Sequence, residues 1–88
     1  MSWKINYSSQ AAKFLKKNSP HSDRIKDCLG LFIQKLAGET VSIDIKNMKG
    51  EWEGTLRIQK GDIRIILNVE EDLKIININI IDFRGSVY

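Results

Sequence analysis

The most constraining feature of this chain is a regular alternation of apolar and polar residues through its second half. Every other residue is apolar in 41–46, and strand-like segments follow at 52–59, 62–69 and 73–82, separated by short polar stretches. Side chains along a strand point to opposite faces in turn, so alternation is typical of strands with one buried face. The frequent isoleucines also favour a pleated sheet. We therefore expect the second half of the chain to form a sheet.

The first half has a different periodicity. Residues 2–7 alternate and predict one further strand. Ser8 or Ser9 can cap a helix, Pro20 suits the first turn of a second helix, and Gly38 ends that helix. The apolar residues of the two helices follow a spacing of three and four: Ala11, Phe14 and Leu15, then Ile25, Cys28, Leu29, Phe32, Ile33 and Leu36. The pattern predicts an antiparallel helical hairpin.

These elements together predict an α+β fold. We expect an N-terminal strand and the helical hairpin packed on one face of a mostly antiparallel four-stranded sheet, in the order β-α-α-β-β-β. A chain of 88 residues has room for a single small domain, here 1–88. No segment is long and apolar enough to span a membrane, and the N-terminus lacks the apolar run of a signal peptide. We expect a cytoplasmic protein without a membrane partner.

The residue counts exclude several kinds of site. Cys28 is the only cysteine and His21 the only histidine, which excludes a disulfide framework, a multi-cysteine zinc site and paired-histidine metal sites. We therefore expect no cofactor and no metal.

The net charge of +3 is unevenly distributed. Residues 1–43 carry seven basic and three acidic side chains, and residues 44–88 carry seven basic and eight acidic ones. A nucleic-acid partner is compatible with this balance. A binding surface in the second half must depend on where individual side chains point, because that half has a net charge of −1.

The predicted hairpin brings two arginines together. Lys60-Gly61 between two alternating segments is typical of a two-residue turn, which would pair Arg57 directly with Arg64. Opposed like charges in a sheet cost about 0.2–1 kcal/mol, so the pair suggests either neighbouring carboxylates or an anion such as phosphate. The alternative is that both arginines are ordinary solvated residues, paired with Glu53, Asp62 or Asp44.

A second turn at Glu70-Glu71 would place Arg64 beside Asn77. The face of the sheet away from the helices then carries polar residues and some isoleucine, a mixture that suits a binding groove. Its polar members are Arg57, Gln59, Arg64, Asn77 and Asn79. Arg84 lies an even number of positions from Ile76, Ile78 and Ile80, which are expected to face the helices. The last strand is therefore expected to bend or bulge before Arg84 can face this groove.

Three segments in this order resemble the RelE/ParE toxin superfamily over almost the whole chain. They are residues 44–50 (DIKNMKG), 56–66 (LRIQKGDIRII) and 83–88 (FRGSVY), preceded by a matching strand at 3–7 and the helix of 12–17. The resemblance implies a type II toxin that a cognate antitoxin holds inactive, with operator DNA bound only through the antitoxin complex. Its RelE branch cuts mRNA in the ribosomal A site by metal-free attack of a ribose 2′-OH on the adjacent phosphate.

The resemblance also implies roles for individual residues. Arg57 and Arg64 would clamp the scissile phosphate and stabilise charge in the transition state. Arg84 would contact phosphate or assist the leaving group, and Tyr88 would stack on a base or transfer a proton. The remaining candidates for RNA contact are Lys13, Lys16, Lys17, Lys49, Gln59 and Lys60.

Two other functions remain open on the same fold. One is ParE-like inhibition of DNA gyrase by binding alone. The other is a catalytically degenerate member that binds only its antitoxin.

Overall fold

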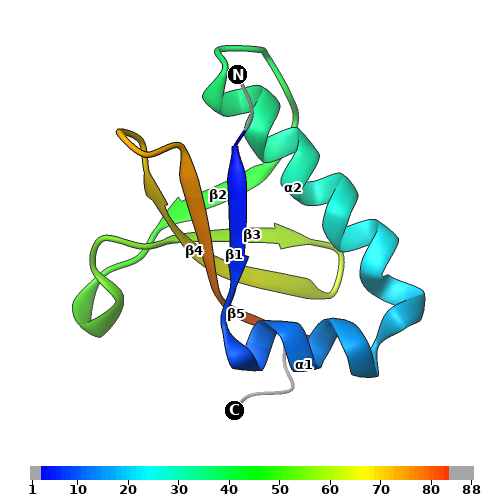
Figure 1. Ribbon diagram of the computed structural model, residues 1–88. Helices are drawn as coiled ribbons and strands as arrows, with labels where there is room; N and C mark the ends of the chain where they lie inside the picture. Colours follow the sequence, from blue (N-terminus) through cyan, green and yellow to red (C-terminus); the bar gives the residue numbers. More distant parts are fainter. Residues whose placement is uncertain (1–2, 84–88) are drawn as a thin grey trace.

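The computed structural model describes residues 3–83, apart from the side chain of Trp52 (Figure 1). The helices are α1 (Ser9–Lys17) and α2 (Ser22–Leu36), with short 3-10 turns η1 (Ser19–His21) and η2 (Gly50–Trp52). The strands are β1 (Lys4–Tyr7), β2 (Asp44–Asn47), β3 (Leu56–Lys60), β4 (Ile63–Glu70) and β5 (Ile75–Phe83). The expected α+β order, with two helices after the first strand, is confirmed.

The sheet is mixed and has the strand order β1-β5-β4-β3-β2. The described residues form five strands where four were expected, because the alternating segments at 41–46 and 52–59 form two separate strands, β2 and β3. β1 runs parallel to β5, while the other neighbouring strands are antiparallel. Figure 1 shows α1 across the foot of the view and α2 rising beside the sheet. Neither helix, within residues 3–83, is long and apolar enough to cross a membrane.

The helices begin and end where the sequence indicates. The Ser8 hydroxyl accepts the Ala11 backbone N–H at 3.1 Å, which satisfies one of the free donors of the first turn of α1. Pro20 lies in η1, directly before α2. Gly38 follows α2 with a φ of +92°, a left-handed conformation common after a helix end.

The core lies between the helices and one face of the sheet. Buried residues come from both layers. The helix members all belong to the predicted helical spacing, and Ile81 takes the inward place that was expected for Ile80. The residues of the core are Ala11, Ile25, Cys28, Leu29, Phe32, Ile58, Ile63, Ile65, Leu67, Ile76, Ile78 and Ile81. The opposite face of the sheet carries neither helix, and we call it the open face.

The turn between β3 and β4 differs from the expected one. Lys60 belongs to β3 and pairs with Ile63. The two turn residues are therefore Gly61 and Asp62 rather than Lys60 and Gly61. Gly61 has a φ of +60°, as the first central position of a type II′ turn requires. Arg24 on α2 donates to the Asp62 carboxylate at 3.1 Å and so ties the turn to the helix. This hydrogen bond also lowers the pKa of Asp62.

The turn between β4 and β5 also differs. Glu70 pairs with Ile75, which leaves four residues in the loop instead of a two-residue turn at Glu70-Glu71. Lys74 closes this loop in a left-handed conformation with a φ of +56°. Asn77 therefore lies opposite Asn68, and the expected pairing of Asn77 with Arg64 is wrong.

A β-bulge changes the alternation of β5. Leu67 pairs with Ile78 but Ile66 pairs with Ile80, so Asn79 is an extra residue. The side chain of Gln10 continues the ladder beyond β1, because its amide accepts the Ile81 N–H at 2.9 Å and donates to the Ile81 carbonyl at 2.8 Å. As a result Ile81 turns into the core, and Asp82 lies on the open face.

Candidate functional site

Arg57 and Arg64 share the open face without lying directly opposite each other. The register places Arg57 opposite Ile66 and Arg64 opposite Gln59. The expected direct pairing is wrong because the turn lies at Gly61-Asp62, one residue later than expected. The shift preserves the faces, since pairing partners change by two positions and side chains alternate with a period of two. The two arginines are therefore diagonal neighbours on adjacent strands.

Arg57 is held in place by two other side chains. One of its terminal nitrogens donates to the Gln59 amide oxygen at 3.0 Å, and the other lies 3.5 Å from the Asp44 carboxylate. Its Nε is buried and has no hydrogen-bond partner within the described residues. A buried donor without an acceptor carries a desolvation cost of about 1–3 kcal/mol.

Arg64 makes a two-pronged ion pair. Its Nε and one terminal nitrogen each donate to a different carboxylate oxygen of Asp82, both at 3.2 Å. The side chains of both residues are more than four-fifths buried, with 18% and 17% exposed. Sequence reasoning missed Asp82 as a partner, because a strand without the bulge at Asn79 would turn its side chain away from Arg64.

The two arginines border a basic hollow on the open face. It has a volume of about 290 Å³ and is lined by Lys46, Asn47, Met48, Lys49, Arg57 and Arg64. Four of these six residues are cationic, and none is acidic. Lys49 is one of the predicted RNA contacts, whereas Lys46 was not predicted. Side chains of this kind bind phosphate oxygens well, the arginines through parallel N–H groups and the lysines as point charges.

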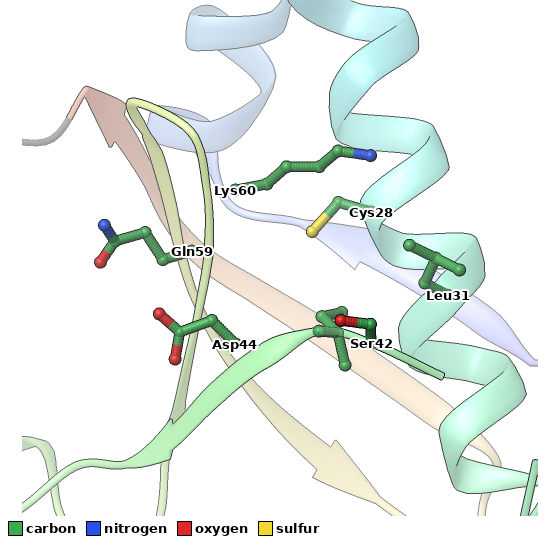
Figure 2. Close-up of a pocket in the computed structure, with 7 residues that line it drawn as sticks. Cys28, Leu31, Ser42, Asp44, Gln59 and Lys60 are labelled. Atoms are coloured by element: carbon green, nitrogen blue, oxygen red, sulfur yellow. The ribbon is translucent and has the colours of Figure 1, made fainter. Parts of the chain in front are cut away.

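A larger hollow lies between α2 and the β2–β3 edge of the sheet. Figure 2 shows Lys60 reaching toward α2, while Asp44 and Gln59 point away from that helix. The volume is about 360 Å³, and Cys28, Leu31, Ser42 and Ile43 complete the lining. Lys60, a predicted RNA contact, is therefore not brought together with Arg57 and Arg64.

Cys28 is not placed for nucleophilic chemistry. Burial raises the pKa of its thiol, although the positive charge of Lys60 acts in the opposite direction. Across residues 3–83, no group of three or more His, Cys, Asp and Glu side chains is arranged to hold a metal ion.

The remaining predicted residues lie away from the basic hollow or outside the described part of the chain. Lys13, Lys16 and Lys17 are exposed on α1, whose inward residues pack on the helix-covered face of the sheet. Arg84 and Tyr88 lie outside residues 3–83, so their predicted roles stay predictions. Asn77 and Asn79, the other polar residues predicted on the open face, donate to Glu70 at 2.7 Å and to Asn68 at 3.1 Å.

Comparison with known proteins identifies the fold. No family model and no curated protein matches the chain. Among solved structures, a chain of the archaeal RelE–RelB complex from Pyrococcus horikoshii OT3 is 26% identical, with 99% of this chain and 100% of that chain covered and a TM-score of 0.67. A chain of the RelB–RelE antitoxin–toxin complex from Methanococcus jannaschii is 25% identical, with 94% of each chain covered and a TM-score of 0.68. The chain has a RelE-like toxin fold.

More distant structures support the same RelE-like fold. A chain of the E. coli DinJ–YafQ toxin–antitoxin complex is only 16% identical, yet the match covers 100% of this chain and 99% of that chain with a TM-score of 0.73. The resemblance drawn from residues 44–50, 56–66 and 83–88 is thus confirmed as a statement about the fold.

Proposed function

We propose that this protein is the toxin of a toxin–antitoxin pair and acts as a ribosome-dependent mRNA endonuclease. The observation that carries the proposal is the basic hollow, in which Arg57 and Arg64 lie beside Lys46 and Lys49 on the open face. Two of the structural neighbours with a RelE-like fold come from RelE–RelB complexes, which supports a cognate antitoxin as the partner of this chain.

In the proposed reaction, Arg57 and Arg64 bind the scissile phosphate of mRNA in the ribosomal A site. The ribose 2′ oxygen attacks the adjacent phosphorus, a new O–P bond forms, and the bond from phosphorus to the 5′ oxygen breaks. Negative charge builds up on the phosphate oxygens, and fixed cations that stabilise it lower the barrier. Contacts with the Gln59 amide and the Asp44 carboxylate hold the Arg57 guanidinium in place before the phosphate binds.

The proton balance involves residues outside the described part of the chain. The 2′ hydroxyl must lose a proton, and the 5′ oxygen must gain one as it leaves. On the family resemblance alone, Tyr88 is proposed to transfer a proton, and Arg84 to assist the leaving group.

The test is to add the purified protein to a cell-free translation reaction and to map the mRNA ends by primer extension. The proposal predicts cuts in phase with codons that appear only when ribosomes are present. Intact mRNA would contradict it. Intact mRNA together with blocked supercoiling by DNA gyrase would favour ParE-like inhibition instead, and inactivity in both assays would leave a protein that binds only its antitoxin.

A further inference from the structure

We infer that Lys46 is a further RNA-binding residue, and that the basic hollow holds two consecutive phosphates of a single strand rather than one. This inference rests on the proposed function. It adds a residue that neither the sequence pattern nor the family resemblance indicates, and it specifies how the bound strand is held.

The first support is the register of β2 and β3. Lys46 pairs directly with Arg57, and both side chains belong to the open face. Directly opposed like charges in a sheet cost about 0.2–1 kcal/mol. The sequence predicted directly opposed cations at Arg57 and Arg64, whereas in the structure the directly opposed cations are Lys46 and Arg57. A bound anion between the two cations would turn the repulsion into attraction.

The second support is the balance of charge around the hollow. Arg57 and Arg64 each have a carboxylate partner, Asp44 and Asp82. Lys46 and Lys49 have no ion-pair partner within residues 3–83. After the two ion pairs are counted, two positive charges are left over, both on lysines that line the hollow. A phosphodiester carries one negative charge, so two consecutive phosphates match this surplus.

The test measures the salt dependence of RNA binding. The probe is a short 2′-O-methyl RNA, which has no 2′ hydroxyl to attack the phosphate, and its dissociation constant is measured over a range of KCl concentrations. Each phosphate contact contributes about 0.7 to the slope of log affinity against log salt for a single strand. Lys46→Gln should weaken binding several-fold at low salt and reduce the slope by about 0.7.

The matched control is Lys26→Gln, which removes the same charge from an exposed position on α2. It should leave the slope unchanged. The inference is overturned if the Lys46→Gln slope equals that of Lys26→Gln, or if the wild-type protein does not bind the probe at low salt.

A third variant, Arg57→Gln, separates this inference from the proposed function. If Arg57→Gln weakens binding and Lys46→Gln does not, only the role of Lys46 is wrong. If neither substitution changes binding, the basic hollow is not the RNA site and the proposed function loses its support as well.

Discussion

Asp82 occupies the guanidinium of Arg64 through two hydrogen bonds, both at 3.2 Å. A carboxylate bound in this way presents the same pair of oxygens that a phosphate would. Substrate phosphate must therefore compete with Asp82 before Arg64 can stabilise it. At the scale of single residues, Asp82 determines how readily Arg64 can bind a phosphate.

Asp82→Asn is expected to tighten binding of the 2′-O-methyl RNA. The substitution removes the competing charge and keeps the shape of the side chain. A largely buried, charge-assisted pair is worth about 1 kcal/mol or more, so the dissociation constant should fall by about fivefold at low salt. Fluorescence anisotropy at a fixed KCl concentration provides the measurement.

The control for this prediction is Asp62→Asn, which also removes one aspartate bound to an arginine, but one in the β3–β4 turn whose partner is Arg24 on α2. It should change RNA affinity much less. A weaker affinity in Asp82→Asn would show instead that Asp82 holds Arg64 in its binding position.

At the scale of elements, alternation predicted the faces of the strands but not their registers. Arg57, Gln59 and Arg64 were placed on the correct face, because any shift of pairing by two positions preserves the faces. Glycine suits either central position of a two-residue turn, so the local pattern fits both Lys60-Gly61 and Gly61-Asp62. The contact of Asp62 with Arg24 lies 38 positions away and carries no local signal.

The alternation of β5 indicated that a bend or bulge must precede Arg84, but the sequence did not indicate at which residue. The extra residue is Asn79, at the point where the side chain of Gln10 takes over the hydrogen bonds of a strand. A contact between the start of a helix and a distant strand depends on how the two elements pack, and the local sequence pattern does not indicate it. Asp82, and with it the partner of Arg64, was missed for this reason.

Gly61→Ala is expected to destabilise the β3–β4 hairpin. Gly61 has a φ of +60°, and a Cβ added there would lie 2.7 Å from a terminal nitrogen of Arg24. The left-handed backbone alone costs about 1–2 kcal/mol for a residue with a Cβ. Urea denaturation should show a lower free energy of unfolding by at least about this amount.

Gly30→Ala is the matched substitution within α2, where an added Cβ has nothing within 4 Å. It should raise the free energy of unfolding by about 0.5–1 kcal/mol, because alanine favours a helix interior over glycine. Equal effects of the two substitutions would contradict the explanation of the turn.

At the scale of the whole molecule, the basic residues form two separate surfaces. Lys13, Lys16 and Lys17 are exposed on α1, in the helix layer, while the basic hollow lies on the open face of the sheet. The second half of the chain is slightly acidic overall, yet it holds this hollow because none of its acidic residues lines it. The net charge of +3 therefore says little about where an anion binds.

The central claim is that the basic hollow on the open face is where the protein acts on mRNA. The direct measurement is the rate of ribosome-dependent cleavage by the wild-type protein, by Arg57→Gln and by Arg24→Gln. The control, Arg24, is also paired with an aspartate, but it lies on α2 beside the β3–β4 turn. All three proteins should first be shown to be folded by circular dichroism.

Removing a preorganised charge that stabilises a transition state costs about 10²–10³ in rate, so Arg57→Gln should cleave at least about 100-fold more slowly than the wild type. Arg24→Gln should remain close to the wild-type rate. Cleavage by a folded Arg57→Gln protein at the wild-type rate would contradict the account.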